Sequence, residues 1–152
     1  MARNWFEALK AFRFSINIPR EHKMLPALGL KRNGANGPYL PKSKPPFTLS
    51  GLGMSTIIAN TEAAIELFEQ GGLSERLSVN EPETAKLIKS ELENVLKIMR
   101  EVGPQGNAAF EEPAAKTLAL AREPFISALI AGGEALATDC GMVLGFTDDD
   151  GD

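Results

Sequence analysis

The sequence contains too little cysteine and histidine for most of the chemistry that these residues support. Its 152 residues include one cysteine, Cys140, and one histidine, His22. Two thiols are needed for an intramolecular disulfide and several Cys or His ligands for a zinc site, so both are excluded. No Ser-His-Asp or Cys-His arrangement is available either. We expect His22 to be a surface residue and Cys140 to be a buried, inert thiol.

Long hydrophobic runs and nucleotide-binding loops are also missing. No apolar stretch reaches the roughly 18 to 20 residues that span a bilayer, and the first residues lack a signal-peptide core, so we expect synthesis in the cytoplasm and no membrane span. The Gly-rich stretch 29–37 does not end in Gly-Lys-Ser/Thr, and the dinucleotide pattern is absent. The acidic run 148–152 lacks the glutamate that closes a calcium loop. We therefore expect no cofactor and no metal.

Charge is present in both signs, but it is distributed unevenly. Residues 1–50 contain nine basic and two acidic side chains, a net charge of +7. Residues 51–152 contain seven basic and eighteen acidic side chains, a net charge of −11. Such asymmetry favours either attraction between the halves of one monomer or a partner for each end, including head-to-tail self-association.

Residues 1–53 form the basic N-terminal segment, which we predict to be a short helix over residues 4–14 followed by an extended arm. Six of the ten prolines lie between residues 16 and 53, together with several glycines, so a long helix is not expected there. The arm is nevertheless rich in apolar residues, unlike a disordered linker. We expect it to lie on a surface, in cis or in trans.

Residues 54–147 have helical periodicity and form the predicted helical domain. The best-marked helix follows a capping-box pattern at Asn80 and Glu83, and Gly103 ends it. Residues 73–79 are interpreted as a connector. Pro124 is expected to kink or restart a later helix, and the glycine pair 132–133 to weaken the middle of that helix or to let another backbone approach closely. The predicted fold is mainly α: a small bundle of three to five helices with an extended, irregular Pro/Gly-rich N-terminal arm and a disordered acidic tail, 148–152.

The scarcity of catalytic side chains favours a non-enzymatic structural or assembly protein, forming a homo-oligomer or larger assembly. We expect its arm and apolar helix faces to pack against neighbouring subunits. Because such arms recur in virus particles, a phage or virion component is a hypothesis by association. The predicted partner-binding residues of the arm are Arg20, Lys23, Leu25, Leu28, Lys31, Arg32, Tyr39, Leu40 and Phe47. The predicted helix interface consists of Ile88, Leu92, Val95, Met99 and Val102, which recur at three- and four-residue spacing.

Two alternative functions remain open at this stage. The basic arm could bind nucleic acid without sequence specificity, with its Lys and Arg side chains on phosphates and Tyr39 and Phe47 stacking on bases. The acidic charge of the whole chain argues against that interpretation. A small helical enzyme that uses carboxylate catalysis is the second alternative.

Overall fold

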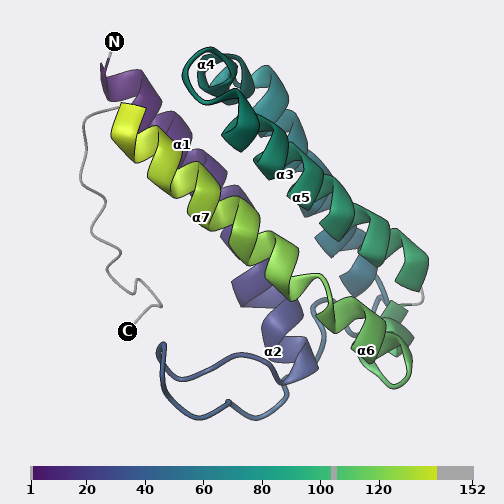
Figure 1. Ribbon diagram of the computed structural model, residues 1–152. Helices are drawn as coiled ribbons and strands as arrows, with labels where there is room; N and C mark the ends of the chain where they lie inside the picture. The colour runs from purple at the N-terminus through teal and green to yellow at the C-terminus, as the bar shows by residue number, and fades with distance from the viewer. Residues whose placement is uncertain (1, 104–105, 140–152) are drawn as a thin grey trace.

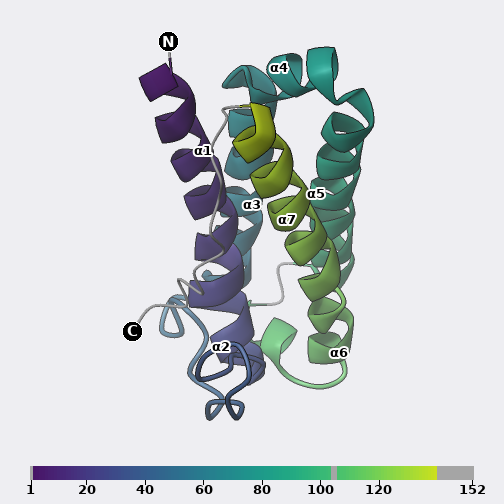
Figure 2. The same ribbon diagram turned by 60° about the vertical axis from the view of Figure 1, so that its left-hand side comes forward.

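The computed structural model describes residues 2–103 and 106–139, and its framework is a bundle of four long helices. These are α1 (Ala2–Asn17), α3 (Gly53–Gln70), α5 (Pro82–Val102) and α7 (Arg122–Asp139). Each helix runs antiparallel to the next, and α7 packs back against α1 to close the ring (Figures 1 and 2). The predicted mainly α bundle is therefore confirmed, with up-down-up-down topology. The predicted acidic tail and Cys140 lie outside the described residues.

The core is built from one apolar face of each long helix. The predicted stripe of α5 is fully enclosed by the other helices of the same chain: Ile88, Leu92, Val95, Met99 and Val102. Between α1 and α3, the ring centroids of Phe12 and Phe68 lie 5.4 Å apart. A Cβ atom on Gly132 of α7 would lie 2.8 Å from Cε1 of Phe12. Glycine at position 132 therefore leaves room for the Phe12 ring, so the close neighbour is a side chain and not the backbone that the sequence suggested.

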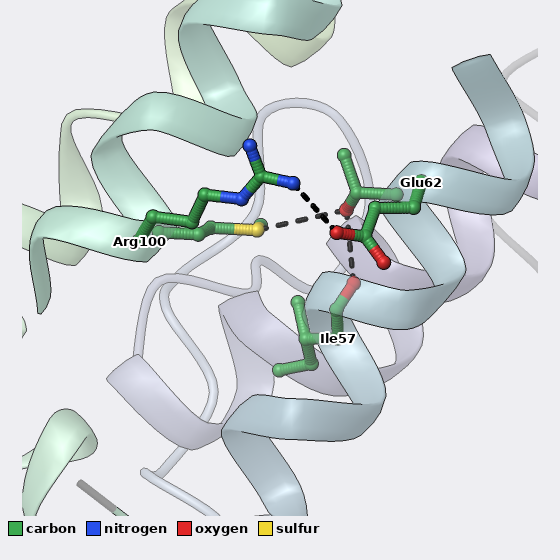
Figure 3. A network of polar contacts seen from close by, with 5 residues as sticks. Ile57, Glu62 and Arg100 are labelled. Carbon is green, nitrogen blue, oxygen red and sulfur yellow. Dashed lines mark hydrogen bonds and ion pairs between the residues drawn. The ribbon is translucent and has the colours of Figure 1, made fainter. Parts of the chain in front are cut away.

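One buried polar side chain joins α3 to α5. The Thr61 hydroxyl donates to the carbonyl oxygen of Ile57 at 2.9 Å and lies 3.6 Å from the sulfur of Met99 (Figure 3). Because the carbonyl satisfies the hydroxyl, burying this group costs little. At the exposed edge of the same contact, Arg100 Nη2 donates to Glu62 Oε1 at 2.7 Å.

The N-terminal helical run is longer than the sequence predicted. α1 continues into a π-helical segment, η1 (Ile18–Met24), and then into α2 (Leu25–Leu28). Pro19 and Pro26 fall at the start of these segments, where a missing N–H costs little. In the wider π turn, the N–H of Leu25 donates to Arg20 O, five residues back. Gly29, at φ 71°, ends the run. The extended arm therefore begins at Gly29 rather than near residue 15.

Shorter helices connect the long ones. α4 (Leu73–Asn80) occupies the stretch predicted as a connector, so α5 begins after Glu81 and the predicted Asn80 cap is wrong. A 3₁₀ turn, η2 (Gly106–Phe110), and α6 (Ala114–Ala119) link α5 to α7. Pro124 lies in the first turn of α7, which confirms a helix restart. In the described part of the chain, no helix combines the length and the apolar character needed to cross a membrane.

The arm, residues 29–52, packs in cis on one end of the bundle. Lys42 Nζ donates to Phe110 O at 2.6 Å, and Asn107 Nδ2 donates to Thr48 O at 2.9 Å. The N-terminal helices share one core with the rest, since Phe12, Ile16 and Met24 are all completely buried. The boundary at residue 53 therefore marks a change of chain conformation and does not divide the core.

Candidate functional site at the arm end of the bundle

Five segments gather at one end of the bundle, which we call the arm end. They are η1, α2, the arm, η2 and α6, and they lie opposite α4 (Figures 1 and 2). Long connections without regular structure are uncommon in compact domains and often carry function. Three features of this end have chemical character: a basic hollow, an exposed apolar loop and an acidic hollow.

The basic hollow has a volume of about 400 Å³ and a mainly polar lining. Four of its cationic side chains come from three parts of the chain: Arg20 of η1, Lys31 and Arg32 of the arm, and Arg122 at the first position of α7. His22 lines it as well and is exposed, as predicted. The one carboxylate in the lining is that of Glu21, which pairs with Arg20 at 2.6 Å. Cations outnumber carboxylates in this lining by four to one.

Tyr39 lies beside this hollow and is held by Arg32. Arg32 Nη2 donates to the phenol oxygen at 3.1 Å, and the guanidinium carbon lies 4.5 Å from the ring centroid. The hydrogen bond and the charge of Arg32 lower the pKa of Tyr39 below its ordinary value, and Arg122 acts in the same direction. The guanidinium groups at this edge therefore favour a negative charge on a neighbouring oxygen.

The exposed apolar loop consists of Phe47, Leu49 and Leu52, and we call these three residues the loop patch. Each is more than half exposed, and Leu49 is fully exposed. Phe47 has φ 53°, a left-handed conformation that is unfavourable for an aromatic residue, and its carbonyl accepts hydrogen bonds from the N–H groups of Ser50 and Gly51. Lys23 Nζ lies 5.8 Å from the Phe47 ring centroid, and burial lowers the pKa of Lys23.

The acidic hollow, of about 390 Å³, lies where the end of α5 meets η2 and α6. Its carboxylates are those of Glu101, Glu111 and Glu112, and its apolar lining includes Val102 and Pro113. Two of the carboxylates pair with lysines, Glu111 with Lys42 at 3.2 Å and Glu112 with Lys116 at 3.5 Å. η2, which contributes Ala108 to this hollow, also packs on the loop that follows Phe47, where a Cβ on Gly106 would lie 3.2 Å from Gly51 O.

The structure brings most of the predicted arm residues together. Arg20, Lys31, Arg32 and Leu40 line the basic hollow, Tyr39 contacts Arg32, and Lys23 contacts Phe47. Two of the predicted residues serve the fold instead. Leu25 is buried and Leu28 is half-buried against the core, because the helical run extends through them.

The predicted helix interface is likewise internal to the chain. Its five residues are at most 4 % exposed, so this apolar face is already covered by α3 and α7 and offers no surface to a neighbouring subunit. Sequence reasoning missed Arg122. The sequence around Arg122 shows only that it lies two residues before Pro124, at the start of a helix. That position does not indicate which residues of the arm lie near its side chain.

The described side chains do not assemble a recognisable catalytic or metal centre. Within residues 2–103 and 106–139, no group of three His, Cys, Asp or Glu side chains is placed to hold one metal ion. What the arrangement can do chemically is attract anions at the basic hollow and bury apolar surface at the loop patch. Comparison of the chain with protein-family models, curated proteins and solved structures gave no match.

Proposed function

We propose that this protein is a non-enzymatic assembly protein whose arm end binds a second copy of the same chain. The observation that carries the proposal is the concentration of exposed apolar side chains on the anchored arm. Of the ten large, exposed apolar residues among the described side chains, five lie within residues 39–52: Tyr39, Leu40, Phe47, Leu49 and Leu52. Exposed apolar side chains that are concentrated in one segment are typical of protein-protein contacts.

Anchoring of the arm supports this role. The arm is fixed to η2 through Lys42 and Asn107, and the turn at Phe47 is closed by two backbone hydrogen bonds. A loop that is ordered before binding loses less conformational entropy when a partner covers it. The unfavourable φ of Phe47 also shows that the fold holds this exposed ring in place at some cost.

Charge complementarity favours a second copy as the occupant. The exposed cation Lys44 lies three residues before Phe47 on the arm, and the acidic hollow at the same end of the bundle contains the carboxylates of Glu101, Glu111 and Glu112. Because cations, carboxylates and the loop patch all occupy one end of the bundle, two copies that meet there through a twofold axis would bring each arm close to the partner's carboxylates. Opposite charges facing one another across the contact favour such an interface, and a twofold contact closes as a dimer.

The proposal is narrower than the sequence interpretation, because the apolar helix faces are not part of it. A role in a phage or virion particle stays a prediction that is based only on the arm-like character of the N-terminal sequence.

The test is the molar mass of the full chain by light scattering after size-exclusion chromatography, over a range of concentrations. Leu49→Asp removes a fully exposed side chain from the loop patch and is expected to give a monomer. The matched control is Val79→Asp, which places the same charge on an exposed apolar position of α4, at the opposite end of the bundle. Val79→Asp should remain a dimer.

Salt and absorbance distinguish this function from the alternatives. A dimer held mainly by apolar burial should persist at high salt, because salt screens exposed charge pairs and leaves the hydrophobic contact intact. Absorbance at 260 nm that disappears at high salt would instead indicate bound nucleic acid. A wild-type monomer at every concentration, or equal disruption by both Asp variants, would overturn the proposal.

A further inference from the structure

We propose that the basic hollow is a binding site for phosphate groups, carried either by a small organic phosphate or by a nucleic-acid backbone. This inference is independent of self-association and goes beyond it. The hollow contains neither the Walker loop nor the dinucleotide loop, so phosphate would be bound by side chains rather than by a glycine-rich backbone cradle.

The first argument is the convergence of charge. Arg20, Lys31, Arg32 and Arg122 come from a π-helical turn, an irregular arm and a helix start, and the fold brings them to one hollow. Like charges placed together repel one another, so a site with this excess of cations is stabilised by an anion. Arginine is suited to the task because its planar fork of donors matches the geometry of phosphate oxygens.

The second argument is an unused donor. The Nε atom of Arg122 is buried and has no hydrogen-bond acceptor among the described protein atoms. Buried donors are normally satisfied, and one that lacks a protein partner beside an open hollow is suited to a ligand oxygen. Arg122 is also the first residue of α7, so the positive end of that helix's dipole adds to the same potential.

The third argument comes from Tyr39, whose pKa reports the electrostatic potential at the edge of the hollow. Tyr39 is the single tyrosine of the chain, and Arg32 and Arg122 lower its pKa. This shift reports a positive potential at the edge of the hollow. A phosphate group bound among the same guanidinium groups should cancel part of that potential and raise the pKa of Tyr39.

Size and lining identify the class of ligand. A volume of about 400 Å³ falls in the range of small-molecule sites, roughly 300 to 1,000 Å³. The lining is more polar than apolar, which suits a ligand dominated by its charged groups. A diphosphate, or two successive backbone phosphates, would match the four cations better than a single anion.

The test is calorimetric titration of the full chain with pyrophosphate at low salt, with a single-stranded oligonucleotide titrated in parallel. Arg32→Gln and Arg122→Gln should each weaken binding about tenfold or more, the usual effect of losing a charge-assisted hydrogen bond. Arg100→Gln is the matched control, since it removes an arginine that pairs with Glu62 on another surface. It should leave binding unchanged.

Tyrosinate absorbance provides a second readout. At a pyrophosphate concentration that just saturates the wild type, the pKa of Tyr39 should rise in the wild type and in Arg100→Gln, and should rise less in Arg122→Gln because fewer of its sites are occupied. Arg32 is largely exposed, so Arg32→Gln keeps the test valid even if Arg122→Gln fails to fold. Circular dichroism checks the folding of each variant.

Every outcome decides the proposal. Binding of pyrophosphate alone identifies a small phosphate as the source, and binding of the oligonucleotide through the same arginines identifies a nucleic-acid backbone; both support a phosphate site. If neither probe binds at low salt, or if Arg100→Gln weakens binding as much as Arg122→Gln does, the proposal is wrong.

Discussion

Gly132 is a position at which α7 packs closely against α1. A Cβ atom there would lie 2.8 Å from the Phe12 ring and 3.4 Å from Cδ1 of Ile88, both in the core. Helix propensity alone favours Gly132→Ala by about 1 kcal/mol. Overpacking of a well-filled core costs typically about 1 to 3 kcal/mol. We expect packing to win and Gly132→Ala to lower the free energy of unfolding, as measured by urea denaturation.

A double-mutant cycle isolates the cause of that destabilisation. Phe12→Leu removes the ring that the new methyl group would meet, so the double variant should lose less stability than the sum of the two single variants. Additive losses would contradict the close contact between Gly132 and Phe12.

Tyr39 provides a prediction about pH at the scale of one residue. Its pKa is lowered from the ordinary 10.0, first by the hydrogen bond and charge of Arg32. Replacing Arg32 with Gln removes a cation that stabilises the phenolate, so the pKa of Tyr39 should rise towards its ordinary value. Absorbance at 295 nm during an alkaline titration measures this directly, because the chain has no other tyrosine. An unchanged pKa in Arg32→Gln would mean that Arg32 does not hold the phenol oxygen in solution.

At the scale of helices, the sequence predicted elements well where a regular stripe coincided with a clear end signal. α5 combines apolar residues at three- and four-residue spacing with Gly103 just after its last residue, and its extent was close to the prediction. α4 was missed because its short length leaves only Leu73 and Leu77 to mark a buried face. Two residues are too few to establish a period.

The helical run through Pro19 and Pro26 was missed for a different reason. The proline rule assumes that an N–H is needed at each position of a continuing α-helix. The rule does not apply to η1, because this segment has i→i−5 hydrogen bonds in place of the α-helical i→i−4 bonds. Each proline then lies in the first turn of a new segment, where its missing N–H is not needed. No local pattern predicts such a π turn, and the run that it continues places Met24 and Leu25 in the core.

The arm is the element whose anchoring is most directly testable. Lys42→Gln removes an ion pair with Glu111 and replaces a charged donor to Phe110 O with a shorter, neutral one. We expect chymotrypsin to cut after Tyr39, Phe47 or Leu49 faster in this variant, because the arm opens more often. Lys44→Gln, which changes the same residue type on the exposed side of the arm, should be cut at the wild-type rate. Equal rates in all three proteins would show that Lys42 does not anchor the arm.

For the molecule as a whole, the candidate site was predictable only in part. The sequence located the basic arm and named Arg20, Lys31, Arg32 and Tyr39, because charge density is visible along the chain. It could not place Arg122 beside them, since that contact joins segments far apart in sequence and no spacing encodes it. The sequence analysis predicted that Leu25 and Leu28 bind a partner. Apolar residues in a Pro-rich segment have the same sequence pattern whether they pack in the protein's own core or at an interface, so the sequence could not separate the two cases.

The last prediction concerns whether the N-terminal segment is part of the folding unit. Deleting residues 1–28 removes the large, fully buried side chains of Phe12, Ile16 and Met24 and exposes the faces of α3 and α7 that α1 covers. Losing large core side chains costs about 2 to 5 kcal/mol each, which together approaches or exceeds the 5 to 15 kcal/mol that stabilises a typical domain.

We therefore expect this truncated chain to lose most of its helical signal and its cooperative thermal transition in circular dichroism. The control deletion removes residues 34–37 from the tip of the arm and joins Asn33 to Pro38, whose backbone groups are already hydrogen-bonded at 3.0 Å. That variant buries the same core and should keep both signals. If the chain without residues 1–28 unfolded as cooperatively as the tip deletion, the part of the chain from residue 29 onwards would fold without α1, and α1 would be free to exchange between copies during assembly.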